Sequence, residues 1–327
     1  MAETSHAEIK IGALNQVGLI VKDIEKTVKD YWNILGIGPH LIVTVEPVDG
    51  YTMTYRGKAA RYKFKASFCR VGAVELELIE SIEGSTIYKD YLKKYGEGAN
   101  HVQSLAKSVK EVDRNIEIMS MNGFPLLMGG RYGNEIAFAY IDTVSALKTI
   151  WETVKMPDEP SGVPVIYPSS DQKVSPAKVK VKAINRIGIV VLDVEKVKES
   201  YQKILGISPW DILELSSPEL HDVTYRSKVV NPRWKIASAT AGPVQLELIQ
   251  PISGKNIYAD FLDNNGEGIH HIQFMVDDIE ETNRIMKEEG FPVLMGGEYH
   301  GERFAYYDTL GPLKVIWKAV QAPKVTP

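Results

Sequence analysis

The sequence predicts an α+β protein made of four βαβββ modules, two in each of two domains. The main observation is an internal repeat, because residues 16–101 align with residues 186–271 at a constant offset of 170 and without a gap. The length of 327 residues is enough for two domains with separate cores. Inside each copy a strand, a helix and several strands follow one another, and the same series then begins again. A repeat of this kind determines the architecture before any residue is given a role.

The first module opens with a strand and a capped helix. The strand is expected over residues 14–22, and Asp23 then offers a good N-cap. Apolar residues follow at helical spacing until Gly36, which ends the helix. Strand-like runs come next at 40–46, 51–57, 62–70 and 73–80. A short helix around residues 85–95 is expected to close the module.

The second module repeats this order. A strand is expected over residues 100–106 and a helix over residues 109–122. Three more strands are expected near 125–131, 135–141 and 147–153. The N-terminal domain is therefore predicted to span residues 10–153, and the C-terminal domain, which carries the same patterns, residues 183–321.

Residues 154–182 are predicted to be a linker between the two domains. The linker contains five prolines, which favour an extended connector with little helix. Its end, KVKVKA at residues 178–183, alternates charged residues and valine. This alternation predicts a strand that leads directly into the second copy.

Composition excludes several classes of function. The net charge of −4 gives no reason to expect a nucleic acid or an anionic membrane as partner. No apolar run approaches a membrane span, and the polar start of the chain lacks the apolar core of a signal peptide. Cys69 is the single cysteine, which excludes an intrachain disulfide and favours a reducing, cytoplasmic location. The apolar run around Cys69 predicts that its side chain is buried.

Alternation along four strands brings polar side chains to one face of the predicted sheet. The apolar side chains of VELELI at residues 74–79 share one face, so Glu77 lies on the opposite face. By the same alternation Gln16, His101 and Glu152 each stand on a mixed or apolar face of their own strands. Any sheet with one solvated face gives such a pattern, so alternation alone does not identify a functional cluster.

Four segments give the chain a resemblance to the vicinal-oxygen-chelate superfamily. This superfamily includes glyoxalase I, methylmalonyl-CoA epimerase, extradiol dioxygenases and bleomycin-resistance proteins. The segments are QVGLIVKDIEKTVKDYWNILGIGP from Gln16, VELELIESIEG from Val74, GEGANHVQ from Gly96, and FAYIDT followed by LKTIWE from Phe138. The chain is most similar to the methylmalonyl-CoA epimerase and glyoxalase I branch. The resemblance implies that the four modules pair into two cup-shaped domains, which form a pseudo-dimer within one chain; whether the chain also forms a homodimer is left open.

The resemblance also implies a metal site in the N-terminal cup. In the family, the ligands of one divalent metal come from the first and last strands of each module. Carried over to this chain, those positions fall on Gln16, Glu77, His101 and Glu152. Three oxygen donors and one imidazole suit Zn²⁺, Ni²⁺, Co²⁺, Mn²⁺ or Mg²⁺.

Such a metal site implies chemistry on a small-molecule carbonyl substrate. A divalent ion acts as a Lewis acid that stabilises an enolate. Glu77 or Glu152, as a carboxylate beside the metal, is then the expected catalytic base for the proton next to the carbonyl. Arg131 and Tyr132, near the rim of the cup, are expected to contact the substrate.

The second copy departs from the first at two of these positions. Arg186 stands where the first copy has Gln16, and Lys318 stands in place of Glu152, whereas Glu247 and His271 keep the residue types of the first copy. Two cations repel a divalent ion, so the second site is predicted to be degenerate, with both cations contacting Glu247. The alternative is a metal-free pocket in which Arg186, Lys318 and His271 bind an anionic ligand.

Two classes of function follow. The first is a metal-dependent isomerase or epimerase that transfers a proton at the carbon next to a carbonyl. The second is a metal-free protein that sequesters a ligand, as bleomycin-resistance relatives do. A lyase is also left open, but a ring-cleaving dioxygenase is less favoured, because that branch holds iron with two histidines and one carboxylate.

Four further histidines are expected to lie outside both predicted ligand sets. His40, His221 and His300 fall in predicted loops or strand ends and are expected at the surface. His270 precedes His271 and is expected to face the opposite side of the strand.

Overall fold

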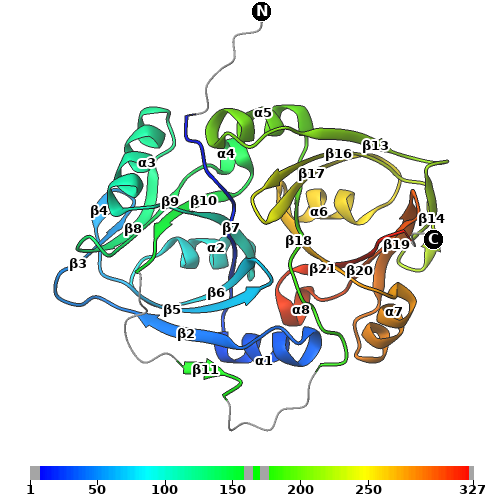
Figure 1. The fold of residues 1–327 in the computed structure, drawn as a ribbon, viewed down its shortest axis with the longest axis horizontal. Coiled ribbons are helices and arrows are strands. Elements are labelled where there is room, and N and C mark those ends of the chain that lie inside the picture. The colour runs from blue at the N-terminus through cyan, green and yellow to red at the C-terminus, as the bar shows by residue number, and fades with distance from the viewer. Residues whose placement is uncertain (1–7, 158–164, 170–176, 324–327) are drawn as a thin grey trace, which may run out of the picture.

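The protein forms two strongly curved β-sheets that lie side by side, one from each copy of the repeat (Figure 1). The computed structural model describes residues 8–157, 165–169 and 177–323. The α+β class and the pairing of four modules into two cup-shaped halves are confirmed.

Each half repeats the same series of elements. The described residues of the N-terminal half form β1 (Gln16–Ile20), α1 (Ile24–Leu35), β2 (His40–Val45), β3 (Tyr51–Tyr55), β4 (Lys58–Ala59), β5 (Lys63–Val71), β6 (Val74–Glu83), α2 (Ile87–Tyr95), β7 (Gly98–Leu105), α3 (Val109–Met121), β8 (Leu126–Tyr132), β9 (Ile136–Ile141), α4 (Val144–Leu147), β10 (Ile150–Lys155) and β11 (Val165–Tyr167). Those of the C-terminal half form β12 (Arg186–Val190), α5 (Val194–Leu205), β13 (Asp211–Leu215), β14 (Leu220–Tyr225), β15 (Lys228–Val229), β16 (Arg233–Ala241), β17 (Val244–Ser253), α6 (Ile257–Asn265), β18 (Gly268–Met275), α7 (Ile279–Glu288), β19 (Val293–Tyr299), β20 (Glu302–Tyr307), α8 (Leu310–Leu313) and β21 (Ile316–Gln321).

The strand order brings the first and last strands of the modules together. The N-terminal sheet has the order β11-β2-β5-β6-β1-β7-β10-β9-β8-β3-β4. At its centre β1 pairs with β6 in parallel and with β7 antiparallel, and β10 pairs with β7 in parallel. The C-terminal sheet repeats these pairings in β17-β12-β18-β21.

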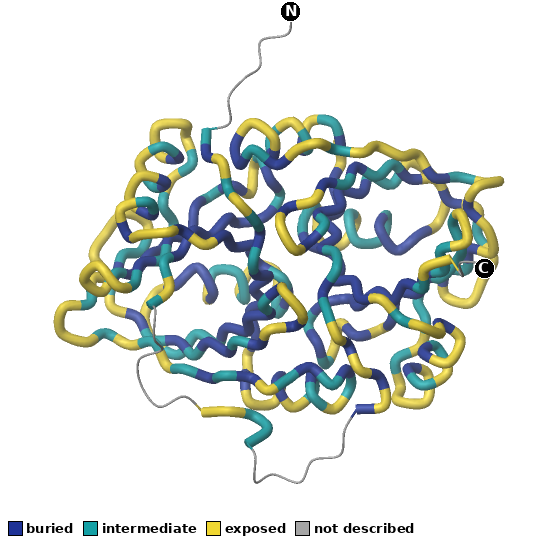
Figure 2. Tube along the Cα trace, viewed as in Figure 1, coloured by how far each residue is buried: buried dark blue, intermediate teal, exposed yellow. Residues whose placement is uncertain are grey.

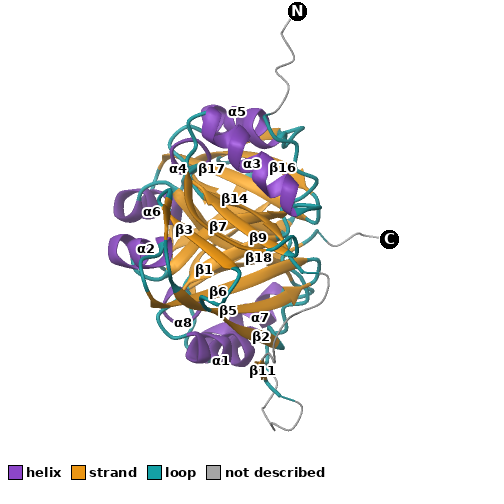
Figure 3. Cartoon of the chain, turned by 90° about the vertical axis from the view of Figure 1, so that its left-hand side faces the viewer, coloured by secondary structure: helices purple, strands orange, loops and turns teal. Residues whose placement is uncertain are grey.

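Helices cover both faces of each sheet. Helices α1 and α3 pack on the outer face of the N-terminal sheet, and α5 and α7 pack on that of the C-terminal sheet. Helices α2 and α6 instead pack on the apolar clusters of the inner faces, through Ile87 and Ile257. Figure 3 shows α2 and α6 together on the same side of the molecule, so a helix covers each curved sheet on that side.

The opening helix of each copy begins and ends as its sequence predicts. The Asp23 side chain accepts a hydrogen bond from the backbone N–H of Lys26, and Gly36 ends α1 with φ of 63°. Asp193 and Gly206 cap α5 in the same way. A left-handed residue at a helix end favours glycine because glycine has no Cβ to clash.

The segments that lead into the two copies are exchanged between the halves. Before β1, the backbone N–H of Ile11 donates to the carbonyl of Leu205, at the end of α5 (3.2 Å). Before β12, the N–H of Val181 donates to the carbonyl of Leu35, at the end of α1 (2.9 Å). Each half therefore holds the leading segment of the other.

The strand predicted at residues 178–183 is wrong, because this run belongs to the leading segment that packs on the other half. The described part of that run forms no strand. Val179 and Val181 are buried in the core, whereas Lys178 and Lys180 are exposed. The alternation therefore marks an extended segment with one side packed on the N-terminal half. Within the described part of the predicted linker beyond Lys155, only β11 is a strand, and it pairs with β2.

The surface position predicted for His40 is also wrong. Its side chain has no exposed area, and its Nδ1 lies 2.8 Å from the hydroxyl of Ser67. His40 begins β2 and packs against the Tyr31 ring, so its imidazole is covered by α1 and β5. Burial lowers the pKa of His40 to about 4. His221 and His300 are exposed, as predicted, and Cys69 is buried.

The interface between the halves has an approximate two-fold symmetry. The hydroxyl of Tyr31 donates to the carbonyl of Leu313 (2.7 Å), and the equivalent Tyr201 donates to Leu147 (3.0 Å). The ion pairs Lys148–Glu267 (2.8 Å) and Lys314–Glu97 (3.0 Å) repeat the same relation. One hydrophobic core contains residues of both halves, and Figure 2 shows buried chain where they meet.

No helix in the described part of the chain is long and apolar enough to cross a membrane.

We predict that Gly242→Ala destabilises the protein more than Gly57→Ala. Both glycines have positive φ (71° and 74°), so alanine is strained at either position. Only at Gly242 would a Cβ overlap the leading segment, at Ala13, whereas a Cβ at Gly57 meets nothing within 4 Å. Overpacking adds about 1–3 kcal/mol, measurable by denaturant unfolding. Equal losses in the two variants would show that the exchanged segment contributes little.

Candidate metal centre

The four central strands of the N-terminal sheet position the predicted ligands. Gln16 lies on β1, Glu77 on β6, His101 on β7 and Glu152 on β10. Glu77 and His101 are both register partners of Gly18, on either side of β1. The side chains of these strands alternate between the two faces, so one face receives all four polar side chains.

Three of these side chains form a compact cluster. Ligand atoms of Glu77, His101 and Glu152 all lie within 4.8 Å of one another. The Nε2 atom of His101 lies 3.1 Å from Oε2 of Glu77 and 3.5 Å from Oε2 of Glu152. All three residues are buried. Among the described residues, this is the one group of three or more His, Cys, Asp or Glu side chains that meets such a spacing.

Gln16 supplies a further buried oxygen on the same face. Its Nε2 donates to Oε1 of Glu75 (2.6 Å), whereas its Oε1 has no hydrogen-bond partner in the described part of the chain. A buried acceptor without a partner costs free energy, and coordination of a cation would satisfy it. One imidazole, two carboxylates and an amide oxygen therefore fit a divalent metal.

Gly18 makes room for the imidazole. A Cβ atom at Gly18 would overlap the ring of His101, which lies directly over β1. Gly188 holds the same relation to His271 in the second half. Gly18 was not predicted as a site residue, although its recurrence as Gly188 two residues after the candidate first-strand ligand is a signal in the sequence.

Further groups around the cluster were also missed. The side chain of Asn100 places its Oδ1 3.3 Å from Nδ1 of His101, and the Tyr140 ring packs edge-on against the imidazole at 5.1 Å between centroids. The hydroxyl of Tyr88 donates to that of Tyr140 (3.0 Å). Such neighbours fix the orientation of a metal-binding histidine.

Burial sets the protonation of the cluster. Desolvation raises the pKa of Glu152 to about 8, against the attraction of His101, and the charge of Glu77 raises it further. The pKa of Glu77 is also raised well above its usual value, by burial and then by Glu75. Burial lowers the pKa of His101. The carboxylates therefore hold protons that a bound cation would displace.

The second cup contains a different cluster at the equivalent positions. Nη1 of Arg186 donates to Oε1 of Glu247 (2.9 Å), and Nζ of Lys318 lies 3.9 Å from Oε2 of the same carboxylate. Both predicted contacts of Glu247 with cations are therefore present. His271 Nε2 lies 3.7 Å from the same Oε2, and His270 Nδ1 lies 3.1 Å from His271 Nδ1.

Arg131 and Tyr132, the two residues predicted to contact substrate, have contacts with residues other than Glu77, His101 and Glu152. The guanidinium of Arg131 forms a two-point ion pair with Asp113 of α3 (2.7 and 3.1 Å), on the helix-covered side of β8. Tyr132 is exposed at the end of β8 and contacts the Tyr51 ring. A substrate role for either residue stays a prediction.

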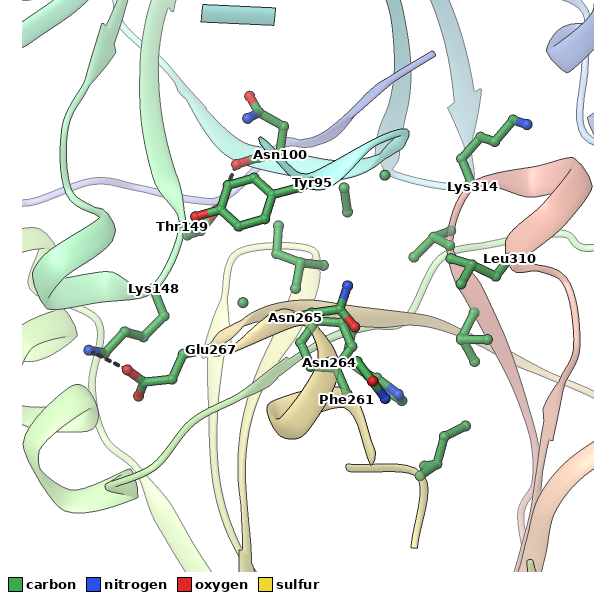
Figure 4. Close-up of a pocket in the computed structure, with 18 of the residues that line it drawn as sticks. Tyr95, Asn100, Lys148, Thr149, Phe261, Asn264, Asn265, Glu267, Leu310 and Lys314 are labelled. Atoms are coloured by element: carbon green, nitrogen blue, oxygen red, sulfur yellow. Dashed lines mark hydrogen bonds and ion pairs between the residues drawn. The ribbon is translucent and has the colours of Figure 1, made fainter. Parts of the chain in front are cut away.

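A separate cavity of about 290 Å³ lies between the two halves (Figure 4). Helices α2 and α6 line it together with the starts of β7, β10, β18 and β21. Figure 4 shows the Lys148–Glu267 ion pair at its edge and the hydrogen bond from Thr149 to the backbone carbonyl of Asn100. Asn100 thus belongs both to the wall of this cavity and to the surroundings of His101.

The chain belongs to the Glyoxalase/Bleomycin resistance protein/Dioxygenase superfamily. The model of this family matches residues 15–140 and again residues 185–307. Each match covers most of one curved sheet, and together they confirm the family expected from the sequence.

Individual relatives resemble parts of the chain. An ethylmalonyl-CoA/methylmalonyl-CoA epimerase of Cereibacter sphaeroides is 30% identical over 119 residues, which are 35% of this chain and 76% of that protein. An uncharacterised protein of Bacillus subtilis, YqjC, is 28% identical over 106 residues, which are 32% of this chain and 66% of that protein. A mutant of 4-hydroxymandelate synthase from Streptomyces coelicolor matches 97% of this chain and 94% of its own, with a TM-score of 0.61 and 14% identity. At that identity the structural match shows the shared two-cup fold.

We predict that the metal-free protein loses stability as the pH rises from about 5 to about 8. The pKa of Glu152 in the folded state, about 8, lies above its ordinary value of 4.5. The folded state therefore binds more protons in that window, and the free energy of unfolding falls as the pH rises. Each unit of pKa difference is worth about 1.4 kcal/mol. Denaturant unfolding of chelator-treated, dialysed protein at several pH values measures the loss.

Glu152→Gln should reduce this pH dependence, because the amide does not titrate. Glu117→Gln, which changes an exposed carboxylate of α3, is the control and should leave it intact. An unchanged pH dependence in Glu152→Gln would contradict the assignment.

Proposed function

We propose that the N-terminal cup binds one divalent metal ion and that the protein is a metal-dependent isomerase or epimerase. The observation that carries the proposal is the buried cluster of Glu77, His101 and Glu152, with Gln16 offering an unpartnered oxygen on the same face. The candidate ions are Zn²⁺, Ni²⁺, Co²⁺, Mn²⁺ and Mg²⁺, because all accept mixed nitrogen and oxygen ligands.

The proposed reaction moves a proton at the carbon next to a carbonyl of a small molecule. A bound divalent ion supplies Lewis-acid stabilisation of the negative charge that develops on the carbonyl oxygen. Gln16 and His101 hold that ion. Glu77 and Glu152 also hold it, and one of them takes the proton from carbon. The similarity to the epimerase of Cereibacter sphaeroides supports this class of reaction.

The side chains around the cluster suit proton transfer. Tyr140 is paired with Glu152 between β9 and β10, and its hydroxyl lowers the pKa of Glu152 against the larger effect of burial. Tyr88 donates to the same hydroxyl (3.0 Å). Glu152 is 5% exposed, so little water reaches its carboxylate.

The alternatives are less well supported by the side chains present. The first cup contains one histidine in the cluster, whereas iron in the ring-cleaving branch is held by two histidines and one carboxylate. A metal-free binding protein has no use for three acidic or imidazole ligands within 4.8 Å of one another. A stoichiometric bound metal separates these functions from the proposed one.

The first test is metal stoichiometry. We expect about one divalent ion per chain after equilibrium dialysis against each candidate ion, measured by elemental analysis. His101→Ala removes the only nitrogen ligand of the cluster and should lose most of the metal. His271→Ala, the matched change in the second cup, should keep it. Two ions per chain in the unmodified protein, or full occupancy in His101→Ala, would refute the site.

The second test concerns the base. Glu77→Gln and Glu152→Gln keep the size and an oxygen donor but remove most of the basicity. At one of these positions, glutamine should abolish the exchange of solvent deuterium into carbonyl compounds that the unmodified protein exchanges, while metal occupancy is largely kept. The loss of a general base typically costs on the order of 10²–10⁴-fold. If both variants keep full exchange activity, the base lies elsewhere.

A further inference from the structure

The second cup combines buried cations and acceptors that lack partners. Arg186 and Lys318 occupy the strand positions that Gln16 and Glu152 occupy in the first cup. Lys318 is 6% exposed, so its ammonium group is almost fully removed from water. Nothing in the metal proposal for the first cup accounts for this arrangement.

The cations of this cluster are compensated only in part. Arg186 and Lys318 carry two positive charges, and Glu247 carries the negative charge in contact with them. The two histidines add no charge, because burial lowers the pKa of His271 well below its usual value and that of His270 to about 3. Glu302, at the start of β20, attracts both cations more weakly than Glu247 does. Burial nevertheless lowers the pKa of Lys318, so the two carboxylates compensate its ammonium only in part.

The hydrogen bonds are also incomplete. Arg186 satisfies Oε1 of Glu247, but the 3.9 Å from Lys318 Nζ to Oε2 is too long for a hydrogen bond. In the described part of the chain, Oε2 of Glu247 and Nε2 of His271 are buried without a hydrogen-bond partner. The ammonium of Lys318 lies against the rings of Tyr306 (5.4 Å) and Phe304 (5.7 Å). The Lys318 ammonium, a donor, and Oε2 of Glu247, an acceptor, thus lie close together without forming a hydrogen bond. Each requires a partner that the described residues of the cluster do not provide.

We propose that the second cup is a metal-free binding site for a small 2-hydroxycarboxylate. The carboxylate of the ligand supplies further negative charge beside Lys318, and it accepts hydrogen bonds from the Lys318 ammonium and from the remaining N–H groups of Arg186. Its hydroxyl donates to Oε2 of Glu247, which needs a donor. The Arg186 side chain is 22% exposed, so a ligand can reach the cluster from the solvent beside Arg186. This site is independent of any metal in the first cup.

The test uses lactate and propionate, which differ by the hydroxyl group. Chelator-treated and dialysed protein is titrated with each anion by calorimetry at constant ionic strength. We expect saturable binding of lactate and at least about tenfold weaker binding of propionate, because propionate leaves Glu247 unsatisfied. Absence of lactate binding at about 10 mM, roughly the weakest affinity that calorimetry can detect, would overturn the proposal. Equal affinities for the two anions would overturn the role of Glu247.

Lys318→Met should reduce lactate binding at least tenfold, since it removes the ammonium that receives the carboxylate. Lys228→Met, which removes an exposed lysine from the same half, controls for net charge and should bind lactate normally. Lys318→Met should remain folded, because it removes a buried ammonium whose hydrogen bonds are incomplete and leaves Glu247 paired with Arg186. Unchanged lactate binding in Lys318→Met, or equal losses in both variants, would contradict the site.

Discussion

The structure depends on how charge is compensated at the centre of each sheet. Four adjacent strands bring polar side chains to the concave face of each cup, where they are removed from water. Burying an ionised group costs several kcal/mol unless an opposite charge or a proton accompanies it. In the first cup burial raises the pKa of Glu77 and Glu152, so their carboxylates hold protons. In the second cup Arg186 and Lys318 supply the counter-charge directly, so that the pKa of Glu247 is lowered despite its burial.

The two cups are held in one body by contacts that repeat across the approximate two-fold axis. Tyr31 and Tyr201 each cross from one half to the other, and each leading segment packs on the opposite half. This exchange also explains why one hydrophobic core contains residues of both halves. The cups are consequently fixed relative to each other, and the cavity between them has walls from both.

Much of this fold could be predicted from the sequence, because the signals were local. The N-cap at Asp23, the left-handed Gly36 and the alternation of strands depend on neighbouring residues, and all are present in the structure. The candidate ligands were harder to place, since their assignment needed a family resemblance, yet three of them converge.

The errors share a physical cause, which is contact between distant segments. The valines before the second copy alternate because one side packs on α1, and alternation alone cannot distinguish that from a strand. His40 is buried by Ser67 and Tyr31, which a reading of its own segment cannot show. Gly18 was missed because its role is to leave space for His101. A glycine has no side chain that contributes to a hydrophobic or polar alternation pattern.

Comparison of the two copies shows which constraints are structural and which are chemical. Residues at the interface keep their types in both copies, as with Lys148 and Lys314 or Glu97 and Glu267, because each side of a two-fold contact must satisfy the same geometry. Gly18 and Gly188 are also equivalent, because both histidines need the same space. The residues that differ, Gln16 and Arg186 above all, lie on the concave faces, apart from the contacts that join the halves. A repeated fold with one shared interface therefore permits two cups of different chemistry, since a change in one cup leaves the contacts that hold the halves together unaltered.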